Sequence, residues 1–70
     1  METERNYIFT FGVGHPHEGY YVKIRGTYGS ARKEMFRRYG DMWAFQYTEE
    51  YYDSFFLEHP WIPREKELVE

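Results

Sequence analysis

Apolar and polar residues alternate along two stretches near the N-terminus. In residues 6–13, the aromatic side chains of Tyr7, Phe9 and Phe11 fall on one face. Residues 20–25 alternate in the same way, and a loop rich in glycine, histidine and proline separates the two stretches. Period-two alternation of aromatic and β-branched residues is typical of strands. We therefore predict two strands that form an antiparallel hairpin.

The pattern then changes to a helical period. Ala31, Met35 and Tyr39 recur every four residues, and basic residues lie on the other side. Ser30 is a suitable N-cap, and Gly40 is placed to end the helix in a left-handed conformation. The sequence therefore predicts an amphipathic helix between Ser30 and Gly40.

Alternation returns in residues 42–47. Trp43, Phe45 and Tyr47 occupy every second position, so we predict a third strand that places these rings on one face. We expect that face to be the one that carries the aromatic residues of the first strand. The predicted sheet order is 2-1-3, with the third strand antiparallel to the first and the helix on one face.

A second helix is predicted directly after the third strand. Thr48 is its N-cap, two glutamates occupy the first turn, and the helix runs to about Leu57. The dipeptide His59-Pro60 ends it. Residues 59–70 form a C-terminal tail that begins with an apolar segment around Trp61 and continues as a charged stretch.

These elements predict one α+β domain of order ββαβα that spans residues 1–70, with a core of about residues 6–58. The sheet is expected to have three strands and to be mostly antiparallel. One helix covers one face of such a sheet. We expect the large aromatic residues to be mainly core, and the other face to be covered by the second helix or by a partner chain.

Composition changes this picture in one respect. Sixteen of 70 residues are aromatic, and each such side chain buries about 150–250 Å². A domain this small has a thin core, so some rings are expected at the surface, in a dimer interface or a binding face. We therefore predict a homodimer or a binding protein. The chain has no cysteine and no long apolar run, which predicts a soluble protein of a reducing compartment without a membrane span.

Charge is divided unevenly between the two halves. Residues 1–40 carry seven Lys or Arg and four Asp or Glu, whereas residues 41–70 carry two and eight. Such asymmetry allows either head-to-tail association of copies of the chain or an acidic face that meets a basic partner.

Few residues suit catalysis or metal binding. His15, His17 and Glu18 are metal-ligand types on one loop, but His59 is the remaining histidine and a closed site needs more ligands. We predict no metal and no cofactor. The serines, Ser30 and Ser54, have helix-cap or helix-surface explanations, and no nucleophile–base set is visible. The sequence therefore predicts a protein that is not an enzyme.

The second helix offers the main candidate site. Its acidic residues are interspersed with aromatic ones, a combination that suits docking to a basic protein groove. The alternative is a core helix with an ordinary polar side. The predicted partner-binding residues are Tyr51, Tyr52, Asp53, Phe56 and Trp61.

The basic half offers an alternative site. Cations on the second strand and the first helix, with a nearby tyrosine, resemble the platforms that bind nucleotides or single strands. The commoner role of such residues is a solvated helix face, and the pI near 5.6 argues against general nucleic-acid affinity. The alternative nucleotide-binding residues are Arg25, Tyr28, Arg32, Lys33 and Arg37.

Three segments together resemble small proteins encoded by bacteriophages and prophages. The segments are Tyr7–Gly14, Ala31–Gly40 and Trp43–Tyr47, and the run Trp-Ala-Phe-Gln-Tyr is the most distinctive. The resemblance implies a viral protein located in the host cytoplasm. Small phage proteins of this kind often act on host defence, so it also implies an inhibitor of a host protein, an anti-defence factor. The alternative it implies is a protein that sequesters a signalling nucleotide.

Overall fold

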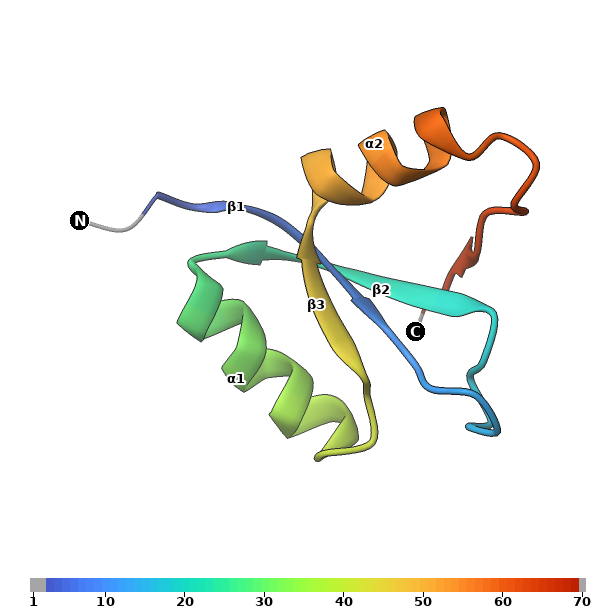
Figure 1. Ribbon diagram of the computed structural model, residues 1–70. Helices are drawn as coiled ribbons and strands as arrows, with labels where there is room; N and C mark the ends of the chain where they lie inside the picture. The colour runs from blue at the N-terminus through green and yellow to red at the C-terminus, as the bar shows by residue number, and fades with distance from the viewer. Residues whose placement is uncertain (1–2, 70) are drawn as a thin grey trace.

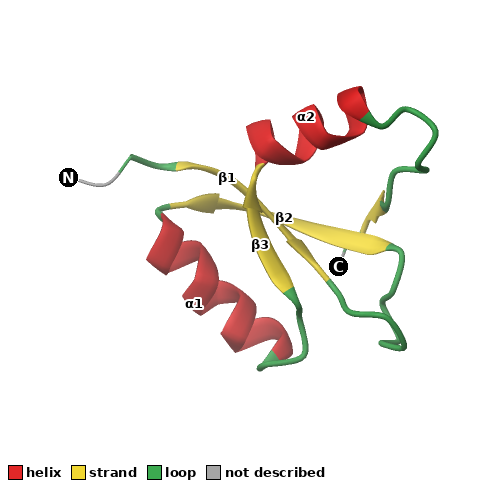
Figure 2. Ribbon diagram, viewed as in Figure 1, coloured by secondary structure: helices red, strands yellow, loops and turns green. Residues whose placement is uncertain are grey.

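The computed structural model describes residues 3–69 and contains a mixed four-stranded sheet with two helices (Figures 1 and 2). Strands β1 (Arg5–Thr10) and β2 (Tyr20–Gly26) form the antiparallel hairpin. Strand β3 (Phe45–Thr48) pairs antiparallel with the other edge of β1. The α+β class, the order 2-1-3 and the antiparallel third strand are thereby confirmed.

The prediction of three strands was wrong by one. Strand β4 (Lys66–Glu67) pairs in parallel with β2, so the sheet order is β3-β1-β2-β4. The N–H of Lys66 donates to the C=O of Gly19 at 3.0 Å, and the N–H of Leu68 donates to the C=O of Tyr21 at 2.7 Å. Because these bonds join backbone groups, no pattern of side chains in the sequence predicts them. The charged end of the chain returns to the sheet, and Leu68 packs against the core.

Helix α1 (Tyr28–Tyr39) begins one turn earlier than predicted. Thr27, not Ser30, is the N-cap: its side chain accepts from the N–H of Ser30, and the Ser30 side chain accepts from the N–H of Thr27. Ser30 is therefore the third residue of a reciprocal capping box. Gly40 ends the helix with φ at 62°, as predicted, a conformation that glycine adopts without strain.

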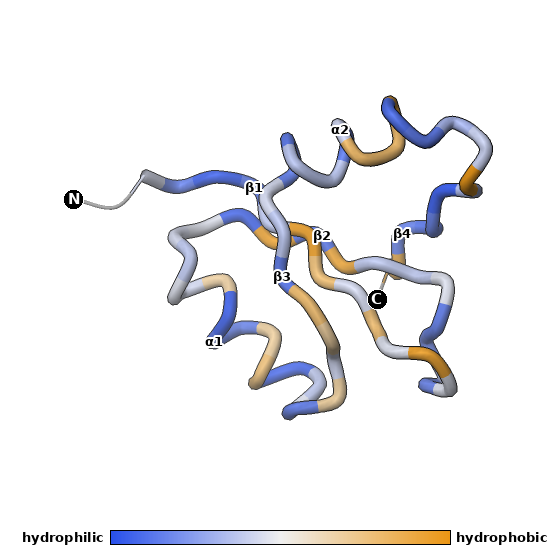
Figure 3. The backbone as a smooth tube through the Cα atoms, viewed as in Figure 1, coloured by the Kyte–Doolittle hydropathy of each residue, from blue (hydrophilic) through white to orange (hydrophobic). Residues whose placement is uncertain are grey.

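The main core lies between α1 and one face of the sheet. Figure 3 shows the most hydrophobic backbone segments in β1 and β2, at the centre of the molecule. The buried members come from β1 and the residue after it, from β2 and from α1: Tyr7, Phe9, Phe11, Val22, Ile24, Ala31 and Met35. The aromatic residues of the first strand are thus core residues, as expected.

The aromatic residues of β3 do not share that face, which corrects the prediction. The register pairs Phe9 with Gln46, so Phe45 and Tyr47 point to the opposite face. Trp43 remains on the α1 side, with its ring 5.1 Å from that of Phe9.

A local offset explains this reversal. Phe45 is the ladder partner of Thr10, yet the C=O of Thr10 accepts from the N–H of Ala44, one residue earlier. A one-residue offset moves the following side chains to the other face. The alternation predicted for residues 42–47 therefore changes phase after Trp43.

Helix α2 (Glu49–Glu58) lies over the second face (Figure 1). Thr48 is its N-cap, as predicted, and its side chain accepts from the N–H of Tyr51. Tyr52 is the buried residue of α2 and contacts the ring of Tyr21 on β2. Ile8 and Thr10 on the same face of β1 are also buried.

Candidate functional site

Helix α2 is fixed to the sheet at its first turn. Glu49 accepts from the Asn6 side chain and from Lys23 Nζ, each at 3.1 Å. Both hydrogen bonds lower the pKa of Glu49 below its ordinary value, and the bond from Asn6 has the larger effect. The negative charge also lies at the positive end of the helix dipole. The first turn of α2 is therefore fixed against β1 and β2, and this orients the side chains further along the helix.

Aromatic rings from β3 and α2 gather on this side of the sheet. Tyr47 and Tyr51 stack almost in parallel, with centroids 5.6 Å apart and 12° between the planes. Tyr52 and Phe56 meet edge to face at 4.9 Å, and Phe55 contacts Phe56 at 5.2 Å. We call this group the α2 aromatic surface; its members are Phe45, Tyr47, Tyr51, Tyr52, Phe55 and Phe56.

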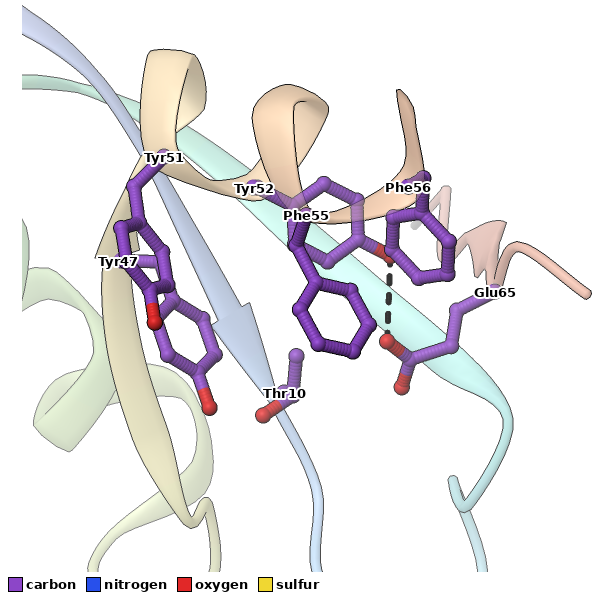
Figure 4. Close-up of a pocket in the computed structure, with 7 residues that line it drawn as sticks. All are labelled: Thr10, Tyr47, Tyr51, Tyr52, Phe55, Phe56 and Glu65. Atoms are coloured by element: carbon purple, nitrogen blue, oxygen red, sulfur yellow. Dashed lines mark hydrogen bonds between the residues drawn. The ribbon is translucent and has the colours of Figure 1, made fainter. Parts of the chain in front are cut away.

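The α2 aromatic surface encloses a cavity of about 180 Å³ between α2 and the sheet (Figure 4). Figure 4 shows the Tyr47 and Tyr51 rings on one side, Thr10 of β1 at the base, and Glu65 on the side opposite the tyrosines. The lining residues are Thr10, Tyr47, Tyr51, Tyr52, Phe55, Phe56 and Glu65.

One hydrogen bond ties the C-terminal segment to this cavity. Tyr52 Oη donates to Glu65 Oε1 at 3.0 Å. Burial, and then the nearby Glu65 carboxylate, raise the pKa of Tyr52 above its ordinary value of 10.0. Burial also raises the pKa of Tyr47, with the neighbouring Tyr51 adding to the effect. Both tyrosines therefore keep their hydroxyl protons, and Tyr52 holds Glu65 beside the aromatic rings.

A cation lies over two of these rings. The Arg64 guanidinium is 5.2 Å from the ring centroid of Phe56 and 6.0 Å from that of Tyr52. Its Nη2 donates to Asp53 Oδ1 at 3.0 Å. Arg64 is thus held by aromatic faces together with a carboxylate, which is cation–π contact supported by an ion pair.

The structure brings most of the predicted partner-binding residues together. Tyr51, Tyr52 and Phe56 line the cavity, and Asp53 joins them through Arg64. Trp61 is 73 % exposed and lies beyond the end of α2. It contacts His59, whose ring stacks on Phe55 at 4.5 Å. Tyr52 forms the inner wall rather than an outer contact, because it is only 7 % exposed.

Sequence reasoning missed four members of the site. Phe55 lies four residues after Tyr51, and Tyr47 four residues before it, so helical spacing was a signal for Phe55 at least. Thr10 and Glu65 enter the cavity through the sheet register and the return of the C-terminal segment. No local pattern carries that information.

The alternative basic residues are divided between the two layers. Arg25 lies on β2 and, like Lys23, points to the α2 side of the sheet. Lys33 is exposed on α1, and Arg37 forms an ion pair with Glu34. The structure therefore does not gather the whole set.

Tyr28 and Arg32 do share a second hollow. The Arg32 guanidinium is 4.9 Å from the Trp43 ring, and its Nη1 donates to Gln46 at 3.4 Å. Trp43 Nε1 is buried without a hydrogen-bond partner in the described part of the chain. This hollow of about 390 Å³ is lined by Tyr28, Arg32, Phe36, Asp41, Trp43, Ala44, Phe45 and Gln46.

The histidine loop has packing partners. His15 stacks on Phe11 at 4.9 Å, and His17 contacts both Phe11 and Tyr39. Within residues 3–69, no three His, Cys, Asp or Glu side chains are grouped to hold a metal ion. Neither described helix is long and apolar enough to cross a membrane.

Comparison of the chain with protein-family models, with curated proteins and with solved structures finds no match.

Proposed function

We propose that this chain is a non-catalytic binding protein that docks on a basic surface of a partner protein through the α2 aromatic surface. The observation that carries the proposal is the exposure of its rings. Phe45 and Tyr51 are each 61 % exposed, beside a cavity lined by further aromatic residues. Aromatic side chains at the centre of a contact supply most of the energy in protein interfaces.

Charge supports a basic partner. Glu50 and Glu58 are exposed on α2, whereas Asp53 between them already pairs with Arg64. Acidic groups around an aromatic centre match the usual arrangement of interfaces, in which apolar rings are surrounded by a polar rim. Complementary charge steers the partner and excludes partners of the same sign.

The partner we propose is a host protein that the chain inhibits in the host cytoplasm. This part of the proposal is supported by the resemblance to small phage proteins. It requires no catalytic group on this chain, because occupation of a functional surface is sufficient for inhibition.

Affinity capture with matched variants tests the proposal. The tagged 70-residue chain is used to capture proteins from a bacterial lysate, beside a Tyr51→Ala, Phe55→Ala double variant and a Met42→Ala control. Met42 is 58 % exposed and lies outside the α2 aromatic surface. We expect a captured protein that the control retains and the double variant loses, and whose activity the wild type inhibits. A partner retained equally by all three would contradict the proposal.

A second candidate function is supported by the hollow beside Trp43. There Tyr28 and Trp43 provide rings for a base, and Arg32 provides a guanidinium for a phosphate. The test is nucleotide binding to the purified chain, measured by calorimetry at low and high salt. Binding that weakens steeply with salt and is lost in Arg32→Gln would support a phosphate-led site. Failure of nucleotides to bind would remove this candidate.

A further inference from the structure

The cavity under α2 combines flat aromatic faces with a carboxylate. Tyr47, Tyr51 and Phe55 contribute rings, and Glu65 lies at the same cavity. Glu65 Oε1 accepts from Tyr52, whereas Oε2 has no hydrogen bond to the described residues. Rings attract a cation through their negative faces, and a carboxylate with an open oxygen accepts from its N–H groups.

The dimensions admit a side-chain head group. A single water needs about 10–15 Å³ of such space, and the cavity offers about 180 Å³. An apolar ligand that displaced water from the open oxygen of Glu65 would leave that oxygen without a partner, which is unfavourable. A cationic ligand would satisfy that oxygen and contact the rings at the same time.

The chain itself holds one example of the same recognition. Arg64 lies over Phe56 and pairs with Asp53, and it does not line the cavity. The cavity presents a second set of rings and a second carboxylate, Glu65. Arginine suits both positions better than lysine, because its planar guanidinium stacks on rings and donates several hydrogen bonds at once.

We propose that this cavity is a recognition pocket for an arginine side chain that projects from the basic partner. The assignment deepens the proposed function and rests on it for the identity of the partner. Tyr47, Tyr51 and Phe55 contact the guanidinium, and Glu65 accepts from its N–H groups. The arginine therefore acts as the anchor around which the rest of the α2 aromatic surface docks.

A charged ligand and its neutral isostere test the pocket directly. N-acetyl-arginine amide and N-acetyl-citrulline amide are titrated into the full chain, and the ring-proton NMR shifts of the lining residues are followed. Citrulline has nearly the same shape but no charge. We expect saturable shifts with the arginine compound and at least tenfold weaker binding of the citrulline and lysine amides. Equal binding of citrulline, equal binding of lysine, or no saturation with arginine would overturn the assignment.

Two charge-removing variants locate the site. Glu65→Gln keeps an acceptor for Tyr52 but removes the charge at the cavity, whereas Glu58→Gln removes the charge of an exposed glutamate that does not line the cavity. We expect at least tenfold weaker arginine binding in Glu65→Gln and a change below twofold in Glu58→Gln. Equal effects would mean that the arginine compound responds to the overall negative charge, and the pocket would be refuted. If Glu65→Gln is unfolded, the citrulline comparison still decides.

The two proposals fail in different ways. If arginine amide does not bind but capture of a partner still depends on Tyr51 and Phe55, the pocket is refuted and protein docking stands. If arginine amide binds but the double variant captures the same proteins as the wild type, the cation site stands and the docking proposal fails.

Discussion

The two faces of the sheet are each covered by a helix, but the α1 face holds more of the buried residues than the α2 face. On the α1 face, Phe9 and Met35 are both 0 % exposed, and α1 presents small and flexible residues to the strands. On the α2 face, Tyr52 is the buried residue of its helix, while Tyr51 and Phe45 point largely into solvent. The α1 face therefore contributes most of the core, whereas the α2 face buries Ile8, Thr10 and Tyr52 and leaves other rings exposed to solvent.

The largest expected contrast is in stability. Phe9→Ala removes a fully buried ring and leaves a cavity, so it should lower the free energy of unfolding by about 3–5 kcal/mol. That loss is comparable with the whole stability of a domain of this size, which is on the order of 5 kcal/mol. Phe45→Ala removes a ring of the same type that is mostly exposed, and should cost less than about 1 kcal/mol. Urea unfolding of both variants measures the difference. Similar losses would mean that the α2 face contributes to folding as much as the α1 face.

The α1 face is also the part that the sequence predicts well. Alternation in β1 and the four-residue period of Ala31, Met35 and Tyr39 are local patterns. The apolar face that each pattern predicts packs against the other in the core. The cap was misplaced because Thr27 and Ser30 both bear hydroxyls, and the reciprocal bonds between them make either residue a plausible cap.

The α2 face was only partly predictable, because its geometry is set by contacts distant in sequence. The mixture of acidic and aromatic residues singled out Tyr51, Tyr52 and Phe56, which line one cavity in the structure. The position of Tyr47 depends on the offset at Ala44, which strict alternation does not reveal. Glu65 reaches the cavity because β4 pairs with β2. The two residues of β4, Lys66 and Glu67, are both polar, so the sequence shows no alternation that would predict a strand there.

The next largest effect is expected in binding. Tyr51→Ala should leave the free energy of unfolding within about 0.5 kcal/mol of the wild type, since the ring is exposed. It should weaken partner binding by about 2 kcal/mol or more, roughly thirtyfold. Phe36→Ala is the control, because Phe36 is an exposed ring on α1. Calorimetry with the captured partner and urea unfolding separate the two effects. Loss of stability in Tyr51→Ala would show that its stacking on Tyr47 is structural.

A smaller effect is expected at the hydrogen bond between Tyr52 and Glu65. Tyr52→Phe keeps the buried ring and removes the hydroxyl. It should cost about 1.5–2 kcal/mol at neutral pH, the lower end of the range for a bond to a charged acceptor, because the pair is only part-buried. The folded protein raises the pKa of Tyr52, so its protonated form is favoured by folding. This contribution is complete below pH 10 and is lost as the pH rises above it.

Unfolding curves between pH 8 and 11 test the direction of that linkage. We expect wild-type stability to fall at the alkaline end and the Tyr52→Phe variant to fall less steeply. Tyr21→Phe serves as the control, because it removes a hydroxyl from a neighbouring ring on β2 that contacts Tyr52. An unchanged alkaline slope in Tyr52→Phe would mean that another group dominates it; Tyr47, whose pKa is also raised, is the next to test.

The smallest effect on stability is expected for the ion pairs of Glu34 on the surface of α1. Hydrogen bonds from Arg37 and then Arg38 lower the pKa of Glu34 from 4.5 to about 2. A carboxylate with a lowered pKa stabilises the folded state above its ordinary pKa, and the benefit is lost as the pH falls toward the lower value. Glu34→Gln should therefore flatten the loss of stability between about pH 4.5 and pH 2. The effect should be small and should shrink in high salt, because these ion pairs are exposed to solvent. Thermal unfolding across that range at two salt concentrations measures it. Since Glu34 lies on the helix that closes the core, a large effect would mean that the α1 layer depends on its surface charges as well as on its buried residues.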